Sequence, residues 1–163
     1  MLSIDKTIDV DTGELRVSSE RAVLRSIALG SCVAFVVYEP DGKIGGLAHI
    51  MLPGKSPSNN NNTKYAEDAI DALLNSVEKL GAKIENLEIS IVGGANILQE
   101  GDLPDLITKS IIDCLEKLDL EVSGMRVGGV ERRSVFLNTA TGNVYYVEGD
   151  NPNKILLTKI TKV

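Results

Sequence analysis

The hydrophobic and polar positions of the chain follow two periods, one typical of strands and one typical of helices. An apolar, β-branched run over residues 33–39 is followed by the turn formers Pro-Asp-Gly at 40–42 and a second apolar run over residues 43–52. Two such runs around a short turn predict a β-hairpin. Residues 87–92 form another short apolar run, which predicts a buried strand.

Two longer segments repeat their apolar residues at helical spacing. The first covers residues 64–80, with Asn62 or Thr63 as the expected cap and Gly81 as the expected stop. It is amphipathic, so we expect it to dock on a sheet. The second helix is expected to start near residues 102–104, where a proline suits the first turn.

Turn formers separate the remaining pieces of the chain. Residues 53–63 are polar throughout and predict a mobile loop, whereas residues 1–20 read as a polar start. After residue 120 the chain consists of short β-rich pieces divided by glycine and asparagine. The expected fold class is α/β: a layered single domain over residues 1–163, with β-sheets flanked by two main helices.

Composition and charge limit the function classes. With 163 residues, 43% of them hydrophobic, the chain is long enough for one sizeable core. It has no apolar run of membrane-spanning length, and its start lacks the basic and apolar segments of a signal peptide. We therefore expect a cytoplasmic protein without direct membrane insertion. A net charge of -6 without a basic block argues against nucleic acid as a partner.

Two cysteines and one histidine carry the candidate chemistry. Cys32 and Cys114 lack C-x-x-C spacing, and a reducing compartment would keep both as thiols. Cys114 lies on the apolar face of the second expected helix, so we interpret it as a packing residue. His49 is the only histidine, which excludes a histidine-rich metal site and makes it the one candidate for a catalytic imidazole. We expect neither metal nor cofactor.

The register of the hairpin decides whether Cys32 and His49 meet. A symmetric register sets Cys32 directly opposite His49, with Cβ atoms roughly 5 Å apart. A type I turn with a bulge would instead set Cys32 opposite Ile50, unless a second bulge at residues 45–46 restored the first pairing. Both registers stay open.

A cysteine close to a histidine is a reactive pair. An unperturbed thiol has a pKa of about 8.5 and is mostly protonated at neutral pH, whereas an adjacent imidazolium stabilises the thiolate. Gly30 allows a substrate to approach the backbone before Cys32, where N–H groups can hold an oxyanion. Residue types alone leave a structural role open as well, because free cysteines are often buried and lone histidines are often structural.

Short motifs in a fixed order carry a family resemblance. Residues 26–53 read SIALGSCVAFVVYEPDGKIGGLAHIMLP, and residues 91–95 read IVGGA. A G-G pair at 128–129, R-R at 132–133 and T-G at 141–142 follow. In this order the motifs resemble the CheD family of chemoreceptor glutamine deamidases, whose signature joins L-G-S-C-V to G-G-x-x-H-x-x-L-P.

The resemblance implies a reaction and a role for each residue. In that family a cysteine is the nucleophile, a histidine is the base, and a threonine six residues before the cysteine orients the imidazole. The matching positions here are Cys32, His49 and Ser26. Serine keeps the hydroxyl of threonine and gains rotamer freedom, so the hydrogen bond can persist. The expected reaction converts receptor glutamines to glutamate through a thioester, with release of ammonia.

The same resemblance implies partners and a fold. The substrate would be the cytoplasmic regions of chemotaxis receptors, and the phosphatase CheC would be a regulatory partner. The catalytic core would be similar to that of the cytotoxic necrotizing factor toxins.

Alternatives remain at this point. A cysteine peptidase or amidase would use the same two residues, and a non-catalytic chemotaxis adaptor would only bind CheC. Residues 53–63 are either a lid or a solvated linker. Residues 132–133 are expected at an exposed strand edge, although they could bind an acidic receptor surface. The glycine pairs at 93–94 and 128–129 fit strand-end turns or close packing near the site.

Overall fold

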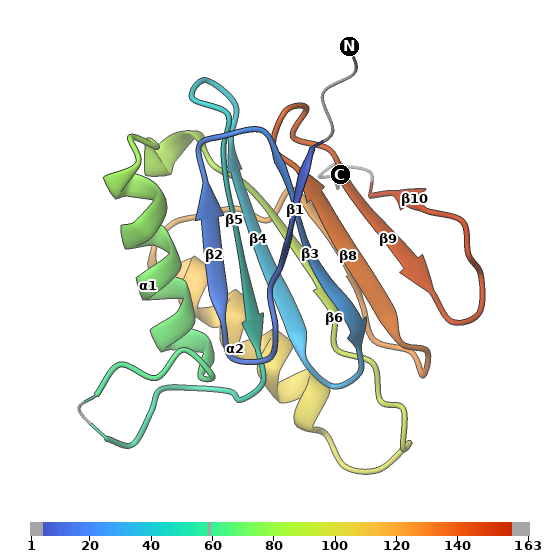
Figure 1. The fold of residues 1–163 in the computed structure, drawn as a ribbon. Helices are drawn as coiled ribbons and strands as arrows, with labels where there is room; N and C mark the ends of the chain where they lie inside the picture. The colour runs from blue at the N-terminus through green and yellow to red at the C-terminus, as the bar shows by residue number, and fades with distance from the viewer. Residues whose placement is uncertain (1–4, 59, 158–163) are drawn as a thin grey trace.

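Two five-stranded sheets form the centre of the protein in the computed structural model, which describes residues 5–58 and 60–157 (Figure 1). The first sheet has the order β1 (Lys6–Asp9), β3 (Ala22–Leu29), β8 (Arg133–Asn138), β9 (Val144–Glu148) and β10 (Ile155–Leu156). The second has the order β2 (Leu15–Ser18), β5 (Ile44–Ile50), β4 (Val33–Glu39), β6 (Glu88–Gly93) and β7 (Gly124–Val127). Both sheets are mixed, because β1 is parallel to β3 and β6 is parallel to β7.

The two main helices cover the outer face of the second sheet. They are α1 (Ala66–Lys79) and α2 (Leu103–Lys117), and the 3-10 turn η1 (Ile84–Asn86) follows α1 (Figure 1). Leu73 and Ile111 of these helices share a buried core with Phe35 of β4. A second core lies between the sheets, where Val36 packs with Leu137. The expected layered α/β fold with two flanking helices is therefore confirmed. No helix in the described residues is long and apolar enough to cross a membrane.

Strand β4 is buried on both faces because it contributes to both cores. Its odd-numbered residues face the helices, and its even-numbered residues face the first sheet. Cys32, immediately before β4, packs with the core between the sheets. On β5, Leu47 belongs to that same core, so alternation points the side chain of His49 to the same side. Cys32 and His49 therefore share one face of the second sheet.

The predicted hairpin is present, but both predicted registers are wrong. Val33 pairs with Ile50 and Ala34 pairs with His49, and the pairing continues without a bulge to Glu39 and Ile44. The turn spans four residues, 40–43, rather than the shorter loops that the prediction assumed. Two features characterise this longer turn.

The first feature is the Glu39 carboxylate, which accepts hydrogen bonds from the backbone N–H groups of Asp41 and Gly42, at 2.7 and 3.4 Å. The second is Lys43, whose left-handed backbone with φ 52° closes the turn at a conformational cost for a residue other than glycine. Continuing the register by one residue sets Cys32 opposite Met51 and diagonal to His49.

Two strands in the expected polar start were missed. Strand β1 joins the first sheet and β2 joins the second, so residues 10–14 cross from one sheet to the other. This crossing runs over the end of β5. The backbone N–H of Gly13 donates to the carbonyl of His49, and the N–H of His49 donates to the carbonyl of Glu14.

Helix α1 begins two residues later than predicted and lacks the predicted cap. Tyr65 is its N-cap, without a side-chain cap hydrogen bond. Thr63 instead donates to the carbonyl of Gly13 at 2.6 Å. The loop over residues 53–63 is tied to both helices, because the Gly54 N–H donates to the Ser110 hydroxyl at 2.7 Å. The buried Asp68 carboxylate also accepts a backbone N–H from this loop at 3.0 Å. Neither the mobility of the loop nor a role as a lid is tested by these contacts.

The prediction of an exposed strand edge at residues 132–133 is wrong for Arg133. Strand β8 is an interior strand that pairs with β3 on one side and β9 on the other. Arg133 is buried with 4% of its surface exposed, whereas Arg132 is exposed. A charged residue at this interior position needs bonded partners rather than solvent.

Candidate functional site

Cys32 lines an open cavity of about 450 Å³ at the turn between β3 and β4. The wall is mainly apolar, with one basic and one acidic side chain, Arg132 and Glu100. Leu98, on the loop between β6 and α2, lines the same cavity and is 80% exposed. The thiol is thus half-buried in an open pocket with an exposed apolar rim.

The imidazole of His49 is fixed by a backbone carbonyl that the sequence did not reveal. Its Nδ1 lies 3.0 Å from the carbonyl oxygen of Val10, in the crossing between the two sheets. A carbonyl can only accept, so Nδ1 carries the proton and donates. Nε2 of the neutral ring is then left with a lone pair, which is the form that a general base requires.

Ser26 contacts the same carbonyl. Its buried hydroxyl donates to the Val10 oxygen at 2.7 Å, and within the described residues it has no hydrogen bond to His49. The carbonyl has two lone pairs and can accept from both side chains. Ser26 therefore holds the group that orients the imidazole. Val10 was missed because any residue type supplies a carbonyl, so its side chain carries no signal.

The relation between Cys32 and His49 is diagonal rather than directly opposed. Diagonal neighbours on one face of an antiparallel pair have Cα atoms roughly 7–8 Å apart and Cβ atoms somewhat closer, which long and aromatic side chains can bridge. The structure thus brings the three predicted residues to one end of the central strands, with Val10 between two of them.

The pKa values of Cys32 and His49 are both shifted in the direction that favours the neutral form. Burial raises the pKa of the Cys32 thiol. Burial also lowers the pKa of His49, opposed more weakly by the Val10 carbonyl and by the carboxylates of Asp11 and Glu14. At neutral pH the resting site therefore holds a thiol and a neutral imidazole rather than a preformed ion pair.

The backbone around Cys32 is held by the end of β6. The N–H of Gly94 donates to the Cys32 carbonyl at 2.9 Å, and the N–H of Ala95 donates to the Gly30 carbonyl at 2.9 Å. A Cβ on Gly93 would lie 2.6 Å from the Cys32 oxygen, so this approach requires glycine. The glycine pair at 93–94 therefore serves close packing beside the site. Among the described residues, the N–H groups of Ser31 and Cys32 donate no hydrogen bond within the protein.

The second cysteine has a different environment. Cys114 of α2 is partly buried and packs against the core between the helices and the second sheet. Burial and the nearby Glu67 carboxylate raise the pKa of this thiol. The interpretation of Cys114 as a packing residue is confirmed.

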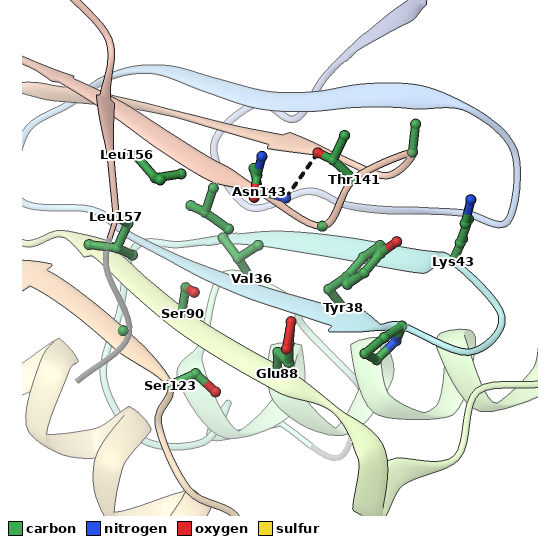
Figure 2. Close-up of a pocket in the computed structure, with 15 residues that line it drawn as sticks. Val36, Tyr38, Lys43, Glu88, Ser90, Ser123, Thr141, Asn143, Leu156 and Leu157 are labelled. Atoms are coloured by element: carbon green, nitrogen blue, oxygen red, sulfur yellow. Dashed lines mark hydrogen bonds between the residues drawn. The ribbon is translucent and has the colours of Figure 1, made fainter. Parts of the chain in front are cut away.

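A separate cavity of about 550 Å³ lies at the opposite end of β4. Figure 2 shows Tyr38, Glu88 and Ser123 around it, together with the hydrogen bond of 3.2 Å from the Asn143 N–H to the Thr141 hydroxyl. Neither cysteine nor histidine lines this cavity. This cavity therefore does not contain the candidate catalytic residues.

The fold and the site define a two-sheet α/β protein with a cysteine–histidine pair at one end of its central strands. A family model described as CheD chemotactic sensory transduction matches residues 51–148. The chain belongs to the CheD family. The matched residues start after His49 and include the glycine pair at 93–94 and Arg133.

Curated relatives extend the similarity to the N-terminal half. A protein of Chlorobium luteolum is 35% identical over 154 residues, covering 92% of this chain and 77% of the relative. One of Methanococcus vannielii is 36% identical, covering 91% of this chain and 99% of the relative. Both are named probable chemoreceptor glutamine deamidase CheD. The chemoreceptor glutamine deamidase CheD of Thermotoga maritima is 31% identical, with 83% of this chain and 87% of the relative covered.

Proposed function

We propose that this protein is a chemoreceptor glutamine deamidase, a protein-glutamine glutaminase that contributes to adaptation in chemotaxis. The observation that carries the proposal is the fixed tautomer of His49, with Nδ1 bonded to Val10 and Nε2 available on the face that it shares with Cys32. The names of the relatives support the substrate class. The whole chain, 1–163, acts as one domain in this proposal.

The first half of the reaction forms a thioester. Nε2 of His49 takes the proton of the Cys32 thiol as the sulfur attacks the carboxamide carbon of a glutamine. The oxyanion of the tetrahedral intermediate accepts hydrogen bonds from the N–H groups of Ser31 and Cys32, which have no acceptor within the described protein. The imidazolium then gives its proton to the amide nitrogen, and ammonia leaves.

The second half releases the product. Neutral His49 removes a proton from water as the water attacks the thioester carbon. The sulfur leaves and regains the proton, and the substrate now carries glutamate. Each turnover adds one negative charge to the receptor, and no step needs a metal ion or an organic cofactor.

Ser26 acts as a positioning residue in this scheme. Its hydroxyl fixes the Val10 carbonyl at 2.7 Å, and that carbonyl fixes the imidazole. Neutral resting forms of Cys32 and His49 fit such a reaction, because proton transfer then accompanies attack on the bound substrate. The burial that favours neutral forms also keeps the thiol from reacting indiscriminately.

The cavity beside Cys32 supports a protein substrate rather than a small molecule. Its apolar rim includes Leu98 and Leu103, which are 80% and 40% exposed. Arg132 on the same rim suits an acidic receptor surface. The substrate in this proposal is the cytoplasmic region of a chemotaxis receptor, so the protein acts in the cytoplasm. A CheC phosphatase would bind as a regulatory partner in this proposal. Competition between CheC and receptor fragments for this rim would test that binding.

Product analysis separates deamidation from proteolysis. A receptor cytoplasmic fragment is incubated with the protein, and free ammonia and new amino termini are measured in the same samples. Ammonia in a one-to-one ratio with new glutamate, without chain cleavage, is the expected result. New amino termini would mean a cysteine peptidase, and binding without either product would mean an adaptor.

A further inference from the structure

A buried arginine lies behind the turn that holds the Cys32 backbone. Arg133 is the first residue of β8, and its side chain is 4% exposed. Nε donates to Oε1 of Glu148 at 2.7 Å. The other oxygen of Glu148 accepts from Nη2 of Arg126 at 2.9 Å. Glu148 thus links a buried guanidinium to an exposed one.

The same guanidinium reaches toward the site with another nitrogen. Nη1 of Arg133 donates to the carbonyl of Gly93 at 3.0 Å, and this hydrogen bond is buried. Gly93 has a φ of 118° and precedes Gly94, with a φ of 63°, so two left-handed residues form the turn. An L side chain rarely adopts this backbone, and the carbonyl direction depends on it.

The Gly93–Gly94 turn also holds the backbone of Cys32 in place. The N–H of Gly94 donates to the Cys32 carbonyl at 2.9 Å. The space between Gly93 and that carbonyl is too small for a Cβ, which would lie at 2.6 Å. A displacement of the Gly93 carbonyl therefore displaces the backbone of Cys32.

The geometry points to Arg133 as a positioning residue for the oxyanion donors: through the Gly93–Gly94 turn it sets the backbone at Cys32, and with it the direction of the Ser31 and Cys32 N–H groups, which have no acceptor in the described residues. This inference rests on the proposed deamidase function. Arg133 does not touch the substrate, and its influence passes through the hydrogen bond to Gly93.

A purely structural ion pair is the competing explanation, and Arg126 provides the matched control. Both arginines bond Glu148, but Arg126 is about half exposed and has no contact with Gly93 in the described structure. If the ion pair alone matters, loss of either arginine should act through stability. If the bond to Gly93 matters, only Arg133 should change catalysis.

The experiment compares Arg133→Gln, Arg133→Lys and Arg126→Gln in the full chain. Deamidation of a receptor fragment gives kcat and KM, and the alkylation rate of Cys32 by iodoacetamide is measured on its peptide. Alkylation displaces iodide without forming an oxyanion, so it reports on the thiol and not on the N–H donors. A lysine keeps the charge but lacks the planar fork that serves Glu148 and Gly93 together.

Arg133→Gln is expected to lower kcat about 10²-fold, with KM and the alkylation rate within about twofold of wild type. Arg133→Lys should lower kcat about tenfold and Arg126→Gln less than twofold, on the same reasoning. If Arg133→Gln fails to fold, the lysine variant decides. Equal kcat in folded Arg133 and Arg126 variants would overturn the inference, as would alkylation that falls in parallel with kcat. A wild type without any deamidation would instead defeat the proposed function.

Discussion

Replacement of Ser26 by alanine tests how the imidazole is oriented. The lost interaction is one buried hydrogen bond of 2.7 Å between the Ser26 hydroxyl and the Val10 carbonyl. A neutral hydrogen bond contributes about 1 kcal/mol net to stability. The Val10 oxygen keeps the Nδ1–H of His49 as a donor, so it is not left unsatisfied. If the whole 1 kcal/mol served to position the imidazole, kcat would fall roughly fivefold.

The assay measures kcat on a receptor fragment for Ser26→Ala, Ser26→Thr and His49→Gln, with urea unfolding as the stability control. Ser26→Thr retains the hydroxyl and should keep kcat within about twofold of wild type. His49→Gln removes the proton-transfer group and should lower kcat at least about 10²-fold. A loss in folded Ser26→Ala as large as that in His49→Gln would refute an indirect role through Val10, because the hydroxyl would then act on the imidazole itself.

Three further changes probe the surroundings of the pair. Because burial lowers the pKa of His49, kcat/KM should rise with pH and reach half of its maximum below about pH 6.5. A midpoint above that value would contradict neutral His49 as the general base. Gly93→Ala should abolish most activity, because the new Cβ would be forced against the Cys32 carbonyl. The control Gly81→Ala has a similar φ of 106° but open space around it, so it should cost only about 1–3 kcal/mol of unfolding free energy. Equal losses of activity in the two variants would show that backbone strain alone is responsible. Cys114→Ala should leave kcat unchanged in the same assay, and a loss would place Cys114 in the reaction.

Patterns that depend on local sequence predicted the fold well. The hairpin and both helices follow from hydrophobic period and from turn residues close to them in the chain. Helix α2 begins where Pro104 indicated. The layered α/β class follows because amphipathic helices and apolar strands bury their faces against each other.

Long-range pairing decided what the sequence could not predict. The register of β4 and β5 is an exception, because the turn that sets it is two residues longer than the symmetric one and is stabilised locally by the Glu39 carboxylate. Strands β1 and β2 are short and polar, so their place at the sheets was set by partners far along the chain. The crossing between them brings Val10 to His49, and this contact has no signature in residue type.

The sequence predicted the reactive side chains of the candidate site, but it did not predict the backbone groups that hold them. Cys32 and His49 stood out because a thiol and an imidazole form a reactive pair, whereas Ser26 was found only through its match to the threonine of the family motif. The groups that support them are carbonyls and N–H groups of Val10 and of the turn at residues 93–94, which every residue carries. Arg133 was misinterpreted because a charged residue in a β-rich segment usually marks an edge, and its partly buried partner Glu148 lies on the next strand.

Site-resolved mass spectrometry of a receptor cytoplasmic fragment tests the central claim most directly. The fragment is incubated with wild type, with Cys32→Ala and with Cys114→Ala as the matched cysteine control. We predict conversion of defined glutamines to glutamate by wild type and by Cys114→Ala at similar rates, and no conversion by Cys32→Ala. Conversion that persists in Cys32→Ala would contradict Cys32 as the nucleophile.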